Sequence, residues 1–200
     1  MNVEVDELSA YVEDLPELAI HSKEIKELTE TLFLVSDTEI EKVQKAFVFV
    51  RDKIAHSWDV QQNEVTKTSL EVLHAGHGIC YAKANLLAAI LRNETIPTGF
   101  CYQRLLLMDK ETGKYCIHAL NAVYLHSKKR WVKLDARGNK EGIQADFDGK
   151  VEKLAFVPNS EEDEYTYPTI YVKPNSQTMI TLSEATNACE MYLKDLPEII

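Results

Sequence analysis

The chain has 200 residues, of which 45% are hydrophobic and 27% are charged, a composition typical of a globular protein with a buried core. Its 22 basic and 32 acidic residues leave a formal net charge of −10, which argues against nucleic acid and anionic membrane as partners. We expect one domain over residues 1–200, comprising a helical N-terminal part (1–55), a core (56–137) and a loop-rich extension (138–200) that ends in a helix.

The start of the chain and its cysteines indicate the compartment. The first residues are acidic and lack the apolar segment of a secretory signal, and no apolar run is long enough to cross a bilayer. We therefore expect a cytoplasmic protein whose four cysteines are reduced: Cys80, Cys101, Cys116 and Cys189. In such a compartment, a cysteine with a special role serves catalysis or metal binding rather than a disulfide.

The first quarter of the chain has the pattern of packing helices. Pro16 interrupts an irregular helical segment over residues 1–35, and the apolar residues that follow it recur at helical spacing: Leu18, Ile25, Leu28 and Leu32. Ser36 followed by Glu39 is a capping-box pattern, which predicts the start of a helix over residues 37–55. The apolar face of that helix consists of Ile40, Val43, Phe47, Val50 and Ile54.

A second capping-box pattern precedes a glycine-rich loop. Thr68 followed by Glu71 predicts a helix of about two turns. Gly76 is placed to end that helix in the left-handed conformation that glycine adopts without strain. The chain then enters the segment on which the functional interpretation depends.

Cys80 opens a dense run of helix formers. Residues 80–94 contain no Gly or Pro, and the helix is expected to stop before Ile96 and Pro97. The unpaired N–H groups of the first turn would favour a thiolate over a thiol at Cys80. The residues that bury this helix recur at helical spacing: Ala84, Leu87, Ala88 and Leu91. By position alone, Cys80 could equally be a small buried hydrophobic residue.

After Pro97 the pattern changes from helix to strand. Residues 98–108 are rich in aromatic and β-branched side chains, and residues 109–113 form a turn signal. Residues 114–125 alternate, residues 126–129 are a polar turn, and residues 130–135 form a third strand. Helices followed by an antiparallel meander predict an α+β fold.

The remainder of the chain is weakly patterned. Residues 136–168 read as a loop-rich excursion with glycine turns, and residues 169–172 could form one more strand. Ser183 and Glu184 predict the start of a final helix that ends near Lys194.

Two polar residues of the meander would meet in a hairpin. If the second and third strands pair symmetrically about His126 and Ser127, His118 lies opposite Asp135 on the same face. A carboxylate there would accept a hydrogen bond from one imidazole nitrogen and leave the other to face a thiol. A slip of one residue would put the two side chains on opposite faces.

These residues resemble the transglutaminase-like superfamily over roughly residues 55–137. The matching segments are Gly78-Ile79-Cys80, Leu91-Arg92, Ile96-Pro97, His118-Ala119, Val123-Tyr124-Leu125 and Trp131-Val132-Lys133-Leu134-Asp135. The resemblance implies a papain-like, cysteine-peptidase-like fold with a nucleophile helix packed on an antiparallel meander. It also implies Cys80 as nucleophile, His118 as general base and acid, and Asp135 as the residue that orients the imidazole.

The chain departs from the family pattern at two positions. Thr95 stands where the family usually has Gly before Ile-Pro, which we interpret as a loop detail. Leu120 stands where an aromatic residue commonly follows the histidine by two positions. The second departure bears on substrate preference rather than on the three residues themselves.

The resemblance implies covalent acyl transfer on an amide of a peptide, a protein or a small molecule, through a Cys80 thioester and without a metal or other cofactor. The backbone N–H of Cys80 is one candidate oxyanion donor, and the indole N–H of Trp58 is a candidate for the second. Three further residues are candidates for the pocket or for substrate contact: Cys116, Arg137 and Asn139. Core packing for Trp58 and Cys116 and a turn-capping role for Arg137 and Asn139 are the alternatives.

Two other functions compete with the enzyme. His74, His77 and Cys80 are spaced by three and, with Cys116 and His118, could assemble a zinc site. The chain could also be a catalytically inactive interaction module that keeps the fold and uses its acidic N-terminal helices for a partner. The sequence contains no calcium-loop pattern and does not indicate an oligomeric state.

Overall fold

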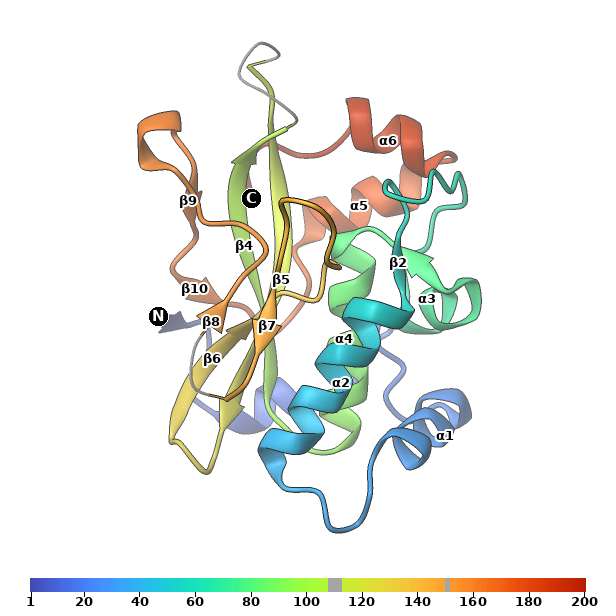
Figure 1. Ribbon diagram of the computed structural model, residues 1–200, viewed down its shortest axis with the longest axis vertical. Coiled ribbons are helices and arrows are strands. Elements are labelled where there is room, and N and C mark those ends of the chain that lie inside the picture. The colour runs from blue at the N-terminus through green and yellow to red at the C-terminus, as the bar shows by residue number, and fades with distance from the viewer. Residues whose placement is uncertain (108–112, 150–151) are drawn as a thin grey trace.

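The computed structural model describes residues 1–107, 113–149 and 152–200. Its largest sheet has four antiparallel strands in the order β6-β5-β4-β9, and helices lie to one side of it (Figure 1). The strands span Tyr165–Thr166 (β9), Thr98–Leu106 (β4), Tyr115–Leu125 (β5) and Arg130–Leu134 (β6). The α+β fold with an antiparallel meander is therefore confirmed. The turn expected at 109–113 lies, except for Gly113, outside the described residues.

Helix α4, Cys80–Asn93, is the centre of the core. Every residue from Tyr81 to Arg92 is buried. The helix contacts strand β5 and also three other helices, which span Lys23–Leu32 (α1), Glu39–Lys53 (α2) and Ser69–Ala75 (α3). Most of its residues are apolar on every side, which favours a position between the sheet and the other helices, and the buried polar residues Lys83, Asn85 and Arg92 are hydrogen-bonded there. The residue at its first position is thus held on a rigid support.

The helix starts confirm one capping box and correct the other. Thr68 and Glu71 form both bonds of the box at α3, and Gly76 ends that helix with φ 71°. At α2 the cap is Thr38, whose box partner is Glu41, so the prediction of Ser36 and Glu39 was wrong. The Thr38 pattern overlaps the Ser36 pattern in sequence.

Glu39 has a tertiary role instead of a capping role. Its carboxylate accepts hydrogen bonds from the backbone N–H groups of His126 and Ser127 at 2.8 and 3.1 Å. The first turn of α2 is therefore tied to the hairpin between β5 and β6.

The hairpin register differs from the expected one by two residues. Leu125 pairs with Arg130 and Asn121 pairs with Leu134, so His118 is not directly opposite Asp135. The reason is that the turn contains four residues, ending at Lys129 with φ 52°, instead of two. Because side chains alternate with a period of two, a shift of two residues keeps both side chains on the same face.

Two short strands join the segment before α4 to the segment after α2. Strand β2, Ala55–His56, runs parallel to β3, His77–Gly78, and His56 pairs with Gly78. This contact brings residues from either side of α3 together just ahead of Cys80.

Residues 1–35 are less helical than predicted, whereas the predicted loop-rich excursion at 136–168 contains short strands. Residues 1–35 contain β1 (Asn2–Val3), a 3-10 helix (Leu8–Val12) and α1, and β1 pairs with β10 (Thr169–Ile170). The excursion at 136–168 contains β7 (Asp146–Phe147), β8 (Glu152–Lys153), a 3-10 turn (Ser160–Glu162) and β9.

The single final helix that began at Ser183 was wrong. The chain forms α5 (Ser176–Glu184) and α6 (Ala188–Lys194), which are capped by Asn175 and Asn187. No helix in the described part of the chain is long and apolar enough to cross a membrane.

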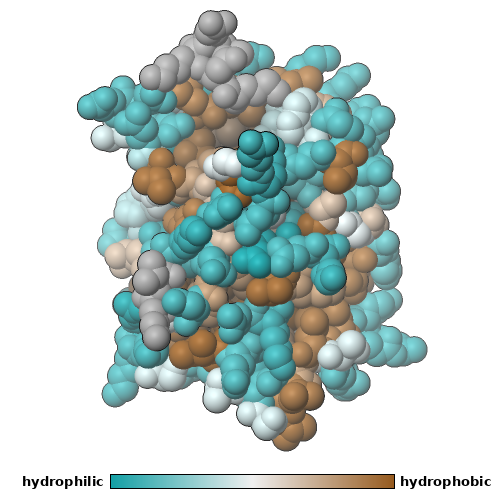
Figure 2. All heavy atoms as spheres, viewed as in Figure 1, coloured by the Kyte–Doolittle hydropathy of each residue, from teal (hydrophilic) through white to brown (hydrophobic). Residues whose placement is uncertain are grey.

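The visible face of the molecule is mostly hydrophilic, and apolar side chains gather in several places, including the lower right part of the view (Figure 2). Leu32, Val48 and Phe49 line a groove between α1 and α2. This groove shares no residue with the cavity described below.

Candidate active site

A cavity of about 520 Å³ lies at the start of α4 and is walled by residues from distant parts of the chain. Five of the seven residues singled out from sequence line it: Trp58, Cys80, Cys116, His118 and Arg137. Asp135 lies behind His118 and is buried. Asn139 lies outside the cavity. The predicted residues therefore gather at one place, with a single exception.

Cys80 is the first residue of α4 and is half-buried, so its thiol lies on a rigid element and lines the cavity. The helix cap is Ile79, and among the described residues no side chain bonds to the N–H groups of the first turn. Such N–H groups carry partial positive charge and favour negative charge beside them. The helix start can therefore stabilise both a thiolate and an oxyanion.

His118 and Asp135 form a buried hydrogen-bonded pair. His118 Nε2 and Asp135 Oδ2 are 2.9 Å apart, and the two residues are 4% and 1% exposed. The carboxylate also accepts hydrogen bonds from the backbone N–H groups of Arg137 (3.3 Å) and Ala155 (3.1 Å). Burial alone would raise the pKa of Asp135, but the His118 charge, its hydrogen bond and these two N–H groups together lower it.

The surroundings of His118 favour its protonated form. Burial acts to lower the pKa of His118, but the negative charges of Asp135 and Cys80 and the hydrogen bonds to both outweigh it and raise the pKa to about 10. Because Nε2 is bonded to Asp135, Nδ1 is the nitrogen available to the Cys80 thiol. The Phe156 ring covers the imidazole edge to face at 4.9 Å. An imidazolium is thus held next to a half-buried thiol.

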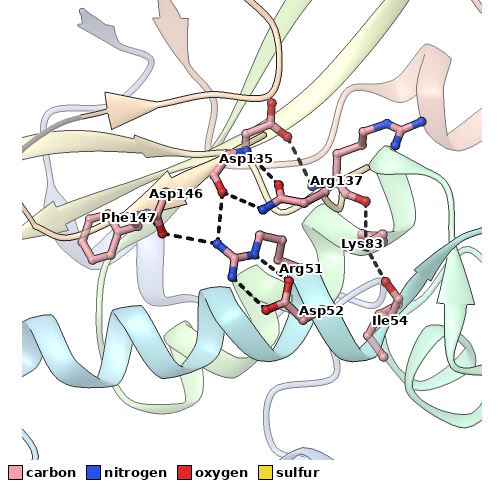
Figure 3. A network of polar contacts seen from close by, with 10 residues as sticks. Arg51, Asp52, Ile54, Lys83, Asp135, Arg137, Asp146 and Phe147 are labelled. Atoms are coloured by element: carbon pink, nitrogen blue, oxygen red, sulfur yellow. Dashed lines mark hydrogen bonds and ion pairs between the residues drawn. The ribbon is translucent and has the colours of Figure 1, made fainter. Parts of the chain in front are cut away.

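The turn after Asp135 is anchored to the nucleophile helix by a buried lysine (Figure 3). Lys83 Nζ donates hydrogen bonds to the carbonyl oxygens of Ile54 (2.5 Å) and Arg137 (2.7 Å). Burial and the nearby Arg137 charge lower the pKa of Lys83 to about 7. Gly138 follows at φ 120°, a backbone conformation that residues with a Cβ rarely adopt, so a glycine suits this position. The position of Asp135 is therefore coupled to that of α4.

Two residues of this turn were candidates for substrate contact. The Arg137 guanidinium lines the cavity, but it is bonded at 2.5 and 2.9 Å to both carboxylate oxygens of Asp59. The Asn139 side chain bonds both the N–H and the C=O of Ala145, which is the alternative turn-capping role. Figure 3 shows Arg51 from α2 reaching the same region, where it bonds Asp146 and Asp52.

Trp58 and Cys116 lie in the cavity walls. The Trp58 ring stacks on Tyr192 of α6, with centroids 4.6 Å apart and planes at 13°. Cys116 precedes His118 by two residues on β5, and burial raises the pKa of its thiol to about 12, so it is a neutral thiol near pH 7. The segment after α6 is held beside it, because Ile117 N–H donates to the Pro197 carbonyl at 2.8 Å.

Three of the aromatic and imidazole rings that line the cavity were not singled out from the sequence: His56, Phe156 and Tyr192. Phe156 and Tyr192 belong to the poorly patterned C-terminal region, and only tertiary folding brings them to the cavity. His56 had one available signal, since it is a histidine next to Trp58 in the segment that precedes the nucleophile.

The zinc arrangement considered from sequence is not assembled. Among the described residues, no group of three or more His, Cys, Asp or Glu side chains could hold a metal ion. His77 Nδ1 lies 3.0 Å from the Ser57 hydroxyl, and His74 is on an exposed surface of α3.

Comparisons with known proteins identify the family and the fold. A family model described as "Transglutaminase-like superfamily" matches residues 26–136. The fold is similar to a crystal structure described as "a Putative Cysteine Protease from Cytophaga hutchinsonii", with a TM-score of 0.53 at 13% identity over 67% of this chain and 43% of that one. A "putative protease from Parabacteroides distasonis" has a TM-score of 0.44 at 15% identity, over 76% of this chain and 30% of that one. The chain thus spans less than half the length of either protein. No curated protein sequence matches it.

Proposed function

The chain belongs to the transglutaminase-like superfamily, and we propose that it is a cysteine-dependent enzyme that opens an amide bond through a thioester on Cys80. One observation carries the proposal: the buried 2.9 Å contact between His118 and Asp135 lies in the wall of the cavity that Cys80 also lines. The similarity to a structure described as a putative cysteine protease supports a peptide or protein amide as the substrate class.

The first half-reaction is acylation of the thiol. The Cys80 thiolate attacks the amide carbonyl carbon, a C–S bond forms, and the carbonyl π electrons move to the oxygen. The His118 imidazolium then gives its Nδ1 proton to the amide nitrogen, the C–N bond breaks, and an amine leaves. Asp135 keeps the imidazole oriented through Nε2 throughout, because its carboxylate is also fixed by two backbone N–H groups.

The second half-reaction resolves the thioester. Neutral His118 takes a proton from a water molecule or from an acceptor amine, whose oxygen or nitrogen attacks the thioester carbon. The C–S bond breaks and the thiolate is regenerated. Water yields a carboxylate, as in a peptidase or amidase, and an amine yields a new amide, as in a transglutaminase. Every group in both steps belongs to the chain or the substrates, so the proposal requires no cofactor.

The proposal is tested by measuring how fast each cysteine is alkylated. Iodoacetamide modification is followed by mass spectrometry at about pH 6.5, where an ordinary thiol is mostly protonated. We expect Cys80 to react well before Cys189, which is also half-buried and serves as the internal control. His118→Ala should abolish the difference because the imidazolium partner is lost, whereas Asn139→Ala should preserve it.

Amide cleavage is then measured with a fluorogenic peptide library, and Cys80→Ala is expected to remove all turnover. If Cys80 reacts no faster than Cys189 in the unmodified protein, the enzyme proposal is wrong. The interaction-module alternative would then be favoured.

A further inference from the structure

A second histidine lines the same cavity, and the mechanism above does not use it. His56 lies on β2, where it pairs with Gly78 two residues ahead of Cys80. Its ring meets the Tyr192 ring edge to face, with centroids 5.9 Å apart, and Tyr192 is itself part of the cavity wall. The imidazole is therefore held near the start of the nucleophile helix.

The hydrogen bonding of His56 is incomplete. The residue is 5% exposed, and its Nδ1 atom is buried without a partner among the described residues. An N–H buried without an acceptor costs about 1–3 kcal/mol, so the ring proton is better placed on Nε2. Since Nδ1 is shielded while the ring lines the cavity, we assign the cavity-facing position to Nε2. The cavity then contains an N–H donor for which the described residues provide no hydrogen-bond acceptor.

The surroundings of His56 keep the ring neutral. Burial lowers the pKa of His56 well below its ordinary value, and the positive charges of Arg137, Lys83 and His118 lower it further, whereas Asp59 acts in the opposite direction. A neutral imidazole neither competes with His118 as an acid nor repels its positive charge. It remains a hydrogen-bond donor at one nitrogen across the neutral pH range.

We propose that His56 is the second oxyanion donor of this site, acting from Nε2 together with the backbone N–H of Cys80. The proposal rests on the proposed thiol chemistry and adds to it the residue that receives the developing charge. When the C–S bond forms, the carbonyl oxygen becomes negative, and Nε2–H strengthens its hydrogen bond to that oxygen without giving up the proton. When the C–N bond breaks, the carbonyl re-forms and the bond weakens again.

Trp58 is the competing donor, and its geometry is less suitable. Its ring is stacked nearly parallel on Tyr192 at the cavity wall, and the residue is less buried than His56. His56 is buried and lies in the strand that pairs directly with the residues preceding Cys80. Preorganised donors that are shielded from water stabilise an oxyanion most strongly.

The test compares two reactions of the same thiol in the full chain. Iodoacetamide alkylates Cys80 by displacement of iodide and forms no oxyanion, whereas p-nitrophenyl acetate acylates it through one. Acylation is read as the burst of p-nitrophenolate and as the acetyl mass on Cys80. His56→Phe keeps a flat ring against Tyr192 and removes the donor. We expect it to slow acylation on the order of 100-fold and to change alkylation by less than about twofold.

A second pair of variants tests the donor role even if His56→Phe does not fold. His56→Gln provides an amide donor and His56→Met, of similar size, does not. We expect the Gln variant to acylate about tenfold faster than the Met variant. Equal rates for this pair would overturn the proposal, as would a larger loss of acylation in Trp58→Phe than in His56→Phe.

Failure of the underlying chemistry gives a different result. If the unmodified protein and Cys80→Ala release p-nitrophenolate at the same rate, Cys80 is not the nucleophile. Both the proposed function and the proposed role of His56 are then overturned. If Cys80 is acylated and His56→Phe has the unmodified rate, the proposed function stands and only this inference is overturned.

Discussion

The two histidine-bearing walls of the cavity differ in how their polar atoms are bonded. The strand wall consists of His118 on β5 and Asp135 after β6, and the loop wall consists of His56 on β2 and Trp58 beyond it. The two rings are equally buried, at 4% and 5% exposed. One ring nitrogen of His118 meets a carboxylate at 2.9 Å, whereas Nδ1 of His56 has no partner among the described residues.

The difference shows that neighbouring charge, and not burial, separates the two rings. Desolvation lowers the pKa of both, but Asp135 and Cys80 reverse its effect on His118 and raise the pKa to about 10. Near His56 the strongest charge effect comes from Arg137, which adds to desolvation and lowers the pKa further. Opposite shifts in one cavity suit an acid on the strand wall and a neutral donor on the loop wall.

The largest expected effect comes from removing the charge that distinguishes the two walls. Asp135→Asn keeps the shape of the side chain but removes the carboxylate that holds His118 as an imidazolium. We expect acylation of Cys80 by p-nitrophenyl acetate to fall on the order of 10³–10⁴-fold. The pKa of His118, followed by NMR, should fall, because the largest of the causes that raise it is lost. A variant that keeps the raised pKa would contradict the comparison.

The pH dependence of stability provides a second, smaller test. The pKa of His118 is raised from 6.5 to about 10 on folding, so its stabilisation is complete below pH 6.5 and is lost as the pH rises through 10. The pKa of Lys83 is lowered from 10.5 to about 7, so its destabilisation is complete below pH 7 and is relieved as the pH rises to 10.5. Between these limits the two contributions oppose each other.

Lys83→Met removes one of the two opposing contributions. We therefore compare the free energy of unfolding of the unmodified protein with that of Lys83→Met. The unmodified value minus the variant value should rise by about 1 kcal/mol per pH unit between pH 7 and pH 10. Urea denaturation of both proteins at three pH values across this range measures the difference. Parallel curves would mean that Lys83 does not titrate there.

Asp59→Asn disturbs the loop wall alone. It removes the charge that pairs with Arg137, which is 4% exposed, and we expect a loss of about 2 kcal/mol in unfolding free energy, less than for a fully buried pair because Asp59 is partly exposed. The pKa of His56 should fall further, because Asp59 acts to raise it. Asp146→Asn, which leaves Arg51 paired with Asp52, is the matched control. If the pKa of His118 shifts in Asp59→Asn as much as the pKa of His56, the two walls are not electrostatically independent.

The smallest effect is expected from Asn139→Ala. This side chain bonds the backbone of Ala145 outside the cavity, so its loss should cost about 1 kcal/mol of unfolding free energy. The rate of iodoacetamide alkylation at Cys80 should not change. If the variant has both a lower alkylation rate at Cys80 and a lower melting temperature, the turn after Asp135 influences the site although Asn139 makes no bond to it.

Local patterns predicted the elements well where a single pattern was present. The helix that begins at Cys80, the Thr68 box and the Gly76 turn are confirmed, because capping and glycine conformation depend on neighbouring residues only. The prediction was wrong where two patterns overlapped, since Ser36 and Thr38 both precede a Glu by three residues. Only Thr38 could cap α2 once Glu39 was bonded to the hairpin turn.

Local sequence patterns also could not predict the register of the hairpin between β5 and β6. A four-residue turn and a two-residue turn are both compatible with the polar residues at 126–129, and they differ by two positions in register. His118 and Asp135 still meet because the observed register differs from the expected one by an even number of residues. Such a shift keeps both side chains on the same face of the sheet.

The sequence by itself determined which residue types follow one another: a cysteine at the start of a buried helix, then a histidine and an aspartate on successive strands. Those features depend on propensity, capping and periodicity, which act over a few residues. Tertiary structure alone decided that Ala155 bonds Asp135, that Tyr192 stacks on Trp58 and that His56 faces the cavity without a partner at Nδ1. Those contacts join segments far apart in the chain, and their charges and hydrogen bonds exist only after the core has packed.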